Sequence, residues 1–352
     1  MTFDTLISFE NLYKALKSSC NGVRWKDSVV TYEKHGIRNT ANLRQDLLNN
    51  TYKITPYRIM TVYEPKQREI CCTQIRDRQA QHCICDNYLY DELCRSFIYD
   101  NFACQKGKGN HLFIKRLKEH LRQYYVENNR SNEGYVLTCD IKKFFNNIPH
   151  DYAKQAIRKR VKMPEVVAFV DMVIDSYEGD VGFYPGSQVI QLVALAVLDD
   201  FDHYIKEELR IKHYMRYNDD FVLIHKDKKY LRYCQEKIEQ ELGKIGLNLN
   251  PKKTKIVPLS KGFKMLHWRF TLKETGKIIL YVEKSKISRQ RKKLKKMAER
   301  VKNGEIPFSD IEDNMRSWED NMRQGCTYHV IRKMRRYVKE LEEYIYGETY
   351  TD

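Results

Sequence analysis

The feature that most constrains this chain is a pair of adjacent aspartates, Asp219 and Asp220, set between two short apolar segments. Residues 214–216 precede the pair and residues 221–224 follow it, and both segments have the composition of a strand. We therefore expect a hairpin that carries two carboxylates at its tip. On these residues alone, a solvated Asn-Asp turn without any chemistry stays an open alternative, because such turns are common in hairpins.

A third carboxylate ends another predicted strand. Residues 136–139 are apolar or small and lead directly into Asp140. One carboxylate at a strand end and two more at a hairpin tip form a donor set that suits two divalent cations. Mg²⁺ prefers carboxylate and phosphate oxygens, and Mn²⁺ can take its place. The three aspartates together therefore predict a two-metal site for phosphoryl transfer.

The charge of the chain points to a polyanionic partner. Lys and Arg number 63 against 47 Asp and Glu, which gives a formal net charge of +16. Residues 284–302 hold ten of these cations and one acid, which is more charge than a merely solvated helix face usually carries. We expect this segment to contact nucleic acid phosphates rather than a membrane. The residues predicted to bind nucleic acid are Lys284, Lys286, Arg289, Arg291, Lys292 and Lys293.

These motifs resemble a known family, the bacterial retroelement reverse transcriptases of the group II intron, retron and diversity-generating type. Residues 217–220 match the family's Tyr-x-Asp-Asp motif, and residues 140–148 match its first catalytic-aspartate motif. Defence-associated reverse transcriptases are close relatives of the same group. Five further blocks stand in the family's order, at residues 64–70, 76–82, 103–111, 249–255 and 263–270.

The resemblance implies a role for each matching residue. Asp140, Asp219 and Asp220 would be catalytic and would hold the two metal ions together with Ile141. Phe145 would lie under the sugar of the incoming nucleotide, where a bulky ring excludes a 2′-hydroxyl, although core packing is the alternative for this ring. The other implied nucleotide-binding positions are Lys66, Arg68, Arg76, Arg78, Gly186, Gln191 and Lys253.

A glycine-containing loop indicates the subgroup. Gly182 and Gly186 would let the backbone approach a nucleotide or template closely, and Gln191 would open the next helix. This block resembles that of the diversity-generating enzymes, with Ile190 at the position of their serine. Asn218 also departs from the family, whose members commonly carry Ala or Met there.

The resemblance and the order of apolar segments imply an α+β fold, a right-hand polymerase with an antiparallel palm sheet backed by helices. Residues 1–125 would form a helical N-terminus and fingers, residues 126–270 the palm, and residues 271–352 a basic helical thumb. We expect a strand over residues 57–63 and a strand pair made of residues 264–270 and 277–282.

Three functions fit these features. The first is an RNA-directed DNA polymerase of a diversity-generating retroelement. The second is an antiphage defence enzyme with templated, untemplated or protein-primed DNA synthesis. The third is a catalytically silent RNA-binding scaffold, which would have no need of the complete set Asp140, Asp219 and Asp220.

The implied partners are a structured non-coding or template RNA, a primer with its cDNA, dNTPs and a small accessory protein. We expect no membrane partner, because the longest apolar stretch, residues 189–198, is too short to span a bilayer. The first residues lack the basic and apolar regions of a signal peptide. A cytoplasmic enzyme encoded by a bacterium or a phage is therefore predicted.

Overall fold

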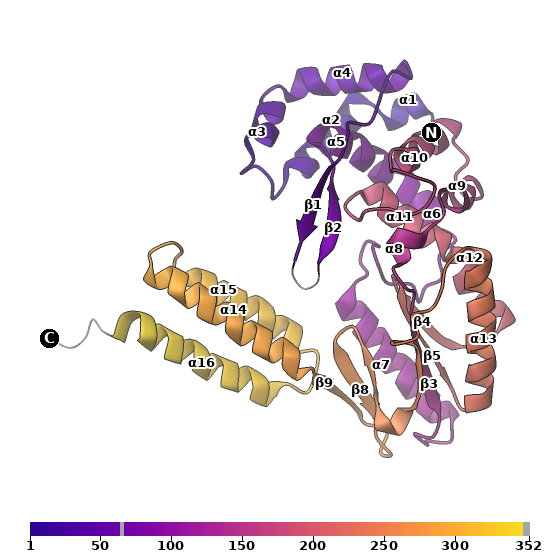
Figure 1. The fold of residues 1–352 in the computed structure, drawn as a ribbon, viewed down its shortest axis with the longest axis vertical. Coiled ribbons are helices and arrows are strands. Elements are labelled where there is room, and N and C mark those ends of the chain that lie inside the picture. Colours follow the sequence, from indigo (N-terminus) through magenta and orange to yellow (C-terminus); the bar gives the residue numbers. More distant parts are fainter. Residues whose placement is uncertain (64–66, 348–352) are drawn as a thin grey trace.

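The computed structural model describes residues 1–63 and 67–347. Figure 1 shows an upper helical part, a lower part built around a sheet, and a bundle of helices that projects sideways toward the C-terminus. No helix in the described ranges is long and apolar enough to cross a membrane.

A four-stranded antiparallel sheet forms the centre of the lower part. Its strands stand in the order β4-β5-β3-β6, so the strand that ends in Asp140 lies beside the hairpin. The predicted hairpin and the strand before Asp140 are confirmed, whereas the edge strand β6 was not foreseen. The strands are β3 (Tyr135–Asp140), β4 (His213–Tyr217), β5 (Asp220–His225) and β6 (Lys255–Pro258).

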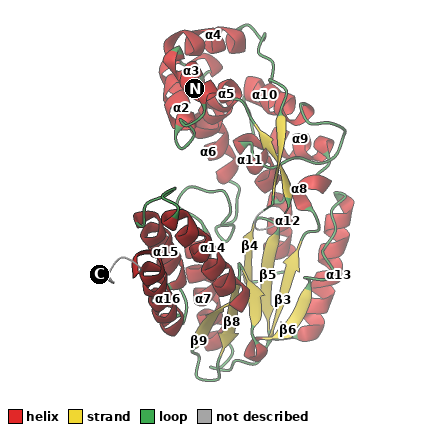
Figure 2. Cartoon of the chain, turned by 60° about the vertical axis from the view of Figure 1, so that its left-hand side comes forward, coloured by secondary structure: helices red, strands yellow, loops and turns green. Residues whose placement is uncertain are grey.

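Side chains alternate along the strands, so each strand sends residues to both faces of the sheet. Both faces are buried, because a separate core covers each one. Leu137 and Leu223 belong to the larger core, which includes helix α13 (Lys228–Lys244). Val136 and Val222 point into a second core on the other face, which includes helix α7 (Asn110–Glu127). Figure 2 shows α13 and α7 on opposite sides of the sheet. Burial on both faces explains why these strands are almost continuously apolar.

Helices make up most of the upper part. Ser8 begins α2 by accepting a hydrogen bond from the Asn11 amide at 3.3 Å, and Leu12 and Leu16 of the same helix are fully buried. The helices are α1 (Phe3–Leu6), α2 (Phe9–Cys20), α3 (Asp27–Lys34), α4 (Gly36–Leu48), α5 (Ile75–Ile84), the π-helical turn η1 (Cys85–Leu89) and α6 (Tyr90–Cys94). An antiparallel hairpin, β1 (Arg58–Val62) and β2 (Arg68–Cys72), extends from this part, which confirms the strand predicted near residues 57–63.

The helices between β3 and β4 join the upper part to the sheet. They are α8 (Phe144–Asn147), α9 (His150–Arg158), α10 (Pro164–Asp175), α11 (Gln188–Val197), α12 (Asp199–His203) and the π-helical turn η2 (Tyr204–Glu208). Nearly every residue of α11 is buried, because this helix packs against α5, α6, α9 and α10.

A second antiparallel sheet corrects one prediction. Residues 264–270 are not one strand but a hairpin, in which β7 (Phe263–Met265) turns into β8 (Trp268–Leu272). The two turn residues, Leu266 and His267, have φ values of 47° and 69°. Bulky side chains rarely adopt this region, so the sequence carries no turn signal there. A third strand, β9 (Ile278–Val282), pairs with β8 as predicted. These helices and antiparallel sheets confirm the α+β class.

Three helices end the described chain: α14 (Lys284–Lys302), α15 (Ser309–Met322) and α16 (Tyr328–Tyr346). The bundle is attached to the second sheet at two places. One is the direct connection from β9 to α14, and the other is the loop between α15 and α16. In that loop the Cys326 amide donates to the Leu280 carbonyl at 2.9 Å, and Lys118 of α7 donates to the Gln324 carbonyl at 2.7 Å.

Candidate active site

The turn of the central hairpin places two carboxylates beside the end of β3. Tyr217 and Asp220 are paired residues, so Asn218 and Asp219 form the turn between them. Asn218 has a φ of 57°, a conformation that Asn tolerates better than most residues. The Ile141 amide donates to the Asp219 carbonyl at 3.1 Å, which ties the turn to the residue after β3. Asp140 and Asp220 are themselves opposite each other in register.

The segment before β6 holds Asp140 in place. The Asn250 amide donates to the Asp140 carbonyl at 2.7 Å, and the Asn250 side chain donates to Asp140 Oδ2 at 2.9 Å. The Lys253 ammonium forms an ion pair with Asp140 Oδ1. Asp140 is only 4% exposed, so these donors balance a carboxylate that has little contact with water. The predicted Lys253 therefore does lie at the predicted aspartates.

The electrostatics of the site show a surplus of negative charge. Burial, followed by the charges of Asp219 and Asp140, raises the pKa of Asp220 to about 7. Burial also raises the pKa of Asp219, and the charge of Asp140 adds to this, while the charges of Lys253 and Arg68 oppose it. The pKa of Lys253 is raised because its hydrogen bond to Asp140 and the charges of the three aspartates outweigh its burial. A bound cation would relieve this repulsion.

We expect Asp220→Asn to stabilise the metal-free protein most at alkaline pH. The folded state holds a proton on Asp220 up to pH about 7, whereas the free side chain loses it near 3.8. Stability is therefore lost as the pH rises through this interval, and the amide avoids the loss. With about 1.4 kcal/mol for each pKa unit, the gain at pH 8 should exceed ~1 kcal/mol. Thermal unfolding with a chelator at pH 5 and pH 8 measures it, and a gain that does not shrink at pH 5 would contradict the expectation.

A cavity of about 420 Å³ opens beside these carboxylates. Asp140 and Asp220 line it together with a ring of cations from the segment before β6, from β6 itself and from the β7–β8 hairpin. Carboxylates that hold metal ions and cations that hold phosphate are both required to bind a polyphosphate chain. The cationic residues are Lys252, Lys253, Lys255, Lys264 and Arg269.

The donor set fits a divalent metal that shares its ligands with a substrate. In residues 1–63 and 67–347 no three His, Cys, Asp or Glu side chains are close enough to surround one ion. Mg²⁺ in polymerases is commonly held by one or two carboxylates, with phosphate and water oxygens as its other ligands. Asp140, Asp219 and Asp220 suit that arrangement. The Ile141 carbonyl accepts no hydrogen bond from a described residue, so it is available as a further ligand.

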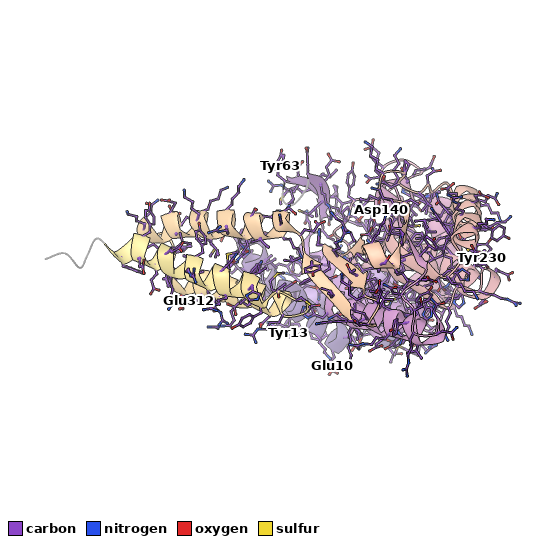
Figure 3. All side chains as sticks on the ribbon, turned by 90° about the horizontal axis from the view of Figure 1, so that it is seen from below. Glu10, Tyr13, Tyr63, Asp140, Tyr230 and Glu312 are labelled. Atoms are coloured by element: carbon purple, nitrogen blue, oxygen red, sulfur yellow. The ribbon has the colours of Figure 1, made fainter. Side chains whose placement is uncertain are left out.

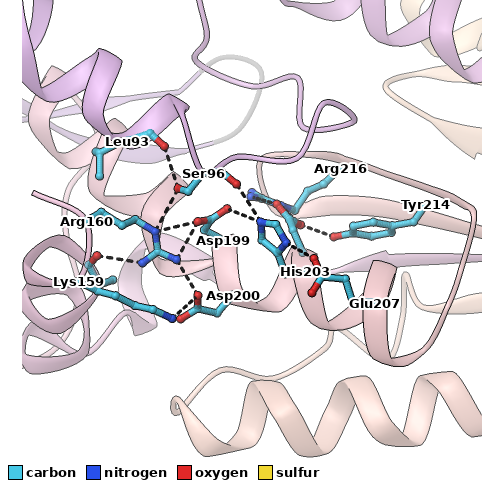
Figure 4. Close-up of polar contacts among 12 residues, drawn as sticks. Leu93, Ser96, Lys159, Arg160, Asp199, Asp200, His203, Glu207, Tyr214 and Arg216 are labelled. Carbon is cyan, nitrogen blue, oxygen red and sulfur yellow. Dashed lines mark hydrogen bonds and ion pairs between the residues drawn. The ribbon is translucent and has the colours of Figure 1, made fainter.

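Behind the hairpin lies a buried ion pair that the sequence prediction missed. Arg216 and Asp202 are both fully buried, and the guanidinium Nε and Nη2 donate to the two carboxylate oxygens at 2.7 and 2.6 Å. Tyr214 also donates to Asp202, at 2.5 Å, and Arg216 Nη1 reaches the Asn218 carbonyl at 3.0 Å. Figure 4 shows Arg216 and Tyr214 beside a neighbouring cluster in which Arg160, just after α9, contacts Asp199 and Asp200 of α12. The signal in the sequence that could have indicated this ion pair is Arg216 itself, a charged residue within a predicted strand.

Phe145 lies on α8, and its side chain is half-buried. Its ring is 5.4 Å from the Phe144 ring, and its carbonyl accepts a hydrogen bond from the Phe183 amide at 2.7 Å. The ring also packs against the larger core. These contacts fix the position of Phe145, and its selection against ribonucleotides stays a prediction.

The two glycines of the predicted nucleotide loop contact the chain's own backbone. A Cβ on Gly182 would lie 2.6 Å from the Asn146 carbonyl oxygen, and one on Gly186 would lie 2.2 Å from the Cys71 oxygen. Both glycines also have positive φ, 94° and 143°. These glycines therefore let the loop pack closely against β2 and α8, and their approach to a nucleotide or template stays a prediction. Ser187 rather than Gln191 begins the helix, and Gln191 is the fourth residue of α11.

The four predicted fingers cations differ in their surroundings. Arg68 is exposed at the start of β2, and its charge acts on Asp219. Arg76 is held within the fold, because it donates to Asp46 at 2.7 Å and lies over the Tyr52 ring at 4.8 Å. Arg78 is half-buried on α5. Lys66 lies outside the described residues.

The predicted basic segment forms one helix, α14, with the same limits of residues 284–302. Its cations line a groove of about 580 Å³ between α14 and α15, whose floor includes Trp318. Arg291 instead lies over the Tyr337 ring at 4.4 Å, and Lys284 is exposed outside the groove. Figure 3 shows Asp140 among the side chains of the part that contains the sheets, and Glu312 on the projecting bundle. The groove cations among the predicted residues are Lys286, Arg289, Lys292 and Lys293.

Several solved structures have a fold similar to that of this chain. Apo telomerase from Candida tropicalis matches with a TM-score of 0.52 and 13% identity, over 85% of this chain and 59% of that one. A form of it truncated from the C-terminal domain matches with a TM-score of 0.48 and 13% identity, over 71% of this chain and 60% of that one. Telomerase from Candida albicans in complex with a TWJ fragment of telomeric RNA matches with a TM-score of 0.49 and 9% identity, over 86% of this chain and 62% of that one. This chain thus spans about 60% of the length of these telomerases.

The sequence itself also has a family match. No sequence among the curated proteins matches the chain. Residues 64–270, more than half of the chain, match the family described as reverse transcriptase (RNA-dependent DNA polymerase). The matched range contains the three aspartates, the hairpin and the β7–β8 turn. The chain therefore belongs to the reverse transcriptase family of RNA-dependent DNA polymerases.

Proposed function

We propose that this polymerase joins deoxynucleotides to a primer at the pocket lined by Asp140 and Asp220, beside the turn residue Asp219, with two Mg²⁺ ions as cofactors. The observation that carries the proposal is the pairing of Asp140 with Asp220 beside several cations of the same pocket. When bound, the ions would lower the pKa of the primer 3′-hydroxyl and neutralise charge on the triphosphate.

Lys253 has a defined part in this proposal. Its raised pKa keeps the ammonium protonated at neutral pH, so it balances Asp140 before a substrate arrives. A protonated amine in this pocket can then contact the phosphates of the nucleotide and give a proton to the departing pyrophosphate. The proposal also gives Arg68 a role in binding phosphate, and the support is that its charge lowers the pKa of Asp219.

Primer extension on an RNA template tests this function directly. Poly(rA) with an oligo(dT) primer and Mg²⁺ should support incorporation of dTTP and of no other nucleotide. Templates with each of the other bases should change the incorporated nucleotide accordingly. Incorporation that ignores the template would favour untemplated synthesis, and no incorporation with Mg²⁺ or Mn²⁺ would favour the RNA-binding scaffold.

We expect Phe145→Ala to weaken the preference for deoxynucleotides. Removing the ring opens space for a 2′-hydroxyl, and steric discrimination of this size is worth roughly 1–3 kcal/mol, or about 10-fold or more. The ratio of kcat/KM for dTTP to that for UTP measures the change, with Phe145→Tyr as the control that keeps the ring. An unchanged ratio with a lower unfolding temperature would assign Phe145 to core packing.

For the biological role we propose a diversity-generating retroelement, in the cytoplasm of a bacterial host, with a dedicated structured RNA and a small accessory protein. The support is the resemblance of the loop and helix over residues 182–194 to that group. Sequencing DNA from cells that carry the native locus tests it. Copies of a nearby repeat with errors at template adenines would support the proposal. Repetitive or untemplated DNA, or many copies of one small RNA, would instead indicate antiphage defence.

A further inference from the structure

A second cationic cavity lies where α15 ends and α16 begins. Its volume is about 480 Å³, and it lies apart from the pocket of the three aspartates. Three of its seven lining residues are arginines and none is acidic. The lining residues are Arg323, Gly325, Thr327, Tyr328, Ile331, Arg332 and Arg335.

The positive charge of this cavity is only partly balanced. Glu319, which is 7% exposed, accepts from Arg335 Nε at 2.6 Å and lies 3.7 Å from Arg323. Within the described ranges no carboxylate forms an ion pair with Arg332. The excess of positive charge also extends along the chain, because residues 323–339 contain six Lys and Arg and no Asp or Glu. One buried carboxylate against three guanidinium groups leaves a site that favours an anion.

An aromatic ring stands at the edge of the same cavity. Tyr328 is 71% exposed, and its ring lies 5.5 Å from the His329 ring in an edge-to-face arrangement. A large exposed ring beside arginines is the combination by which proteins bind single-stranded RNA, because the ring stacks on a base while guanidinium groups bind phosphates. An acidic peptide would use the arginines and leave the ring without a partner.

This cavity and the groove of α14 lie on different sides of α15. The groove and the cavity share no lining residue. Trp318 lines the groove, whereas the next residue, Glu319, contacts the arginines of the cavity. Successive residues of an α-helix point about 100° apart, so the two sites open in different directions. Both sites can therefore be occupied at the same time.

The cavity is also fixed relative to the sheet that carries β7 and β8. Gly325 lies in its wall, and a Cβ added there would come within 2.3 Å of the Trp268 ring. The hydrogen bond from Cys326 to Leu280 holds the same loop. An RNA segment bound here would keep a constant distance from the palm.

We propose that the cavity lined by Arg323, Arg332 and Tyr328 binds single-stranded RNA, separately from the template–primer duplex. This inference rests on the proposed polymerase function, which requires binding of a template and a primer. The cavity would add a second RNA-binding site to that function. A structured RNA that serves the enzyme could occupy it while the α14 groove holds the duplex. Binding here requires neither metal nor catalysis, so it can be tested apart from DNA synthesis.

The test uses the full chain without Mg²⁺, saturated with an RNA–DNA hairpin that has a short template overhang. Fluorescence anisotropy then follows a labelled rU₁₂ oligonucleotide. We expect Arg323→Glu/Arg332→Glu to weaken rU₁₂ binding at least tenfold. The slope of log affinity against log salt should fall by about 1.4, or 0.7 for each lost phosphate contact. Lys292→Glu/Lys293→Glu in the α14 groove should leave rU₁₂ binding unchanged. Arg335 is left intact because it hydrogen-bonds buried Glu319 directly, whereas Arg323 lies 3.7 Å from Glu319 and is largely exposed.

Two further measurements separate the site from a general effect of charge. Photo-crosslinking of rU₁₂ that contains 5-iodouridine should label Tyr328, and Tyr328→Ala should weaken binding while Tyr328→Phe retains it. Unfolding temperature and extension of poly(rA)/oligo(dT) should be unchanged in the Arg323→Glu/Arg332→Glu variant. Unchanged rU₁₂ affinity in that variant would overturn the proposal. Equal competition by a twelve-residue polyglutamate would overturn it too, because any anion would then suffice.

Discussion

Asp219→Ala should abolish DNA synthesis and leave RNA binding close to that of the wild type. Asp219 forms the turn of the hairpin, and its main-chain carbonyl, which the substitution keeps, is the group that bonds Ile141. The change therefore removes a carboxylate and little structure. In the proposed two-metal site, the loss of this ligand would remove several kcal/mol of charge stabilisation from the transition state, which corresponds to roughly 10³-fold or more in rate.

Primer extension and RNA binding, measured on the same preparation, check this expectation. Asp180→Ala is the matched control, since Asp180 is exposed and its described contact, with the His150 amide, uses the main chain. The control should retain full activity. If Asp219→Ala lost RNA binding together with synthesis, the residue would be structural rather than catalytic.

Arg216→Met should cause the largest loss of stability of any single change considered. It leaves the fully buried Asp202 carboxylate without its bidentate partner, and breaking a buried pair in this way costs about 3–5 kcal/mol. Activity should fall as well, because Arg216 also donates to the Asn218 carbonyl in the turn that carries the proposed catalytic residue Asp219. The sheet and the site thus depend on the same guanidinium.

Denaturant unfolding and a double variant separate these effects. Arg216→Met/Asp202→Leu removes both charges, so it should recover much of the lost stability while activity stays low. Arg158→Met is the surface control, because its pair with Asp171 is half exposed and should be worth less than about 1 kcal/mol. A double variant as unstable as Arg216→Met alone would show that packing, rather than the unpaired carboxylate, is responsible.

The sequence was sufficient where local pattern and chemistry agree. The strand before Asp140, the hairpin around Asp219 and the helix over residues 284–302 each combine apolar spacing with a distinctive run of charge. Such features depend on neighbours in the chain, and the structure contains all three. The meeting of Asp140 with Asp220 also follows once the two strands are paired.

Other features depend on contacts between distant residues. Leu266 and His267 form a turn without Gly or Asn, so nothing local marks it. The contact of Gly186 with the Cys71 carbonyl of β2 joins residues more than one hundred positions apart, so no local pattern predicts it. Arg323, at the end of α15, and Arg335, within α16, lie twelve positions apart, and only the fold brings both to the Glu319 carboxylate. Sequence spacing alone cannot show such a cluster.

The two attachments of the C-terminal bundle have a mechanical consequence. A body joined to another at one point can swing in any direction, whereas each further attachment removes part of that freedom. Here the β9–α14 connection and the loop at Gly325, which lies against Trp268, hold the same end of the bundle, and Met322 of α15 packs in the core of the second sheet. A tilt of the bundle would therefore displace its far end, where α14 ends, much more than the loop at Gly325.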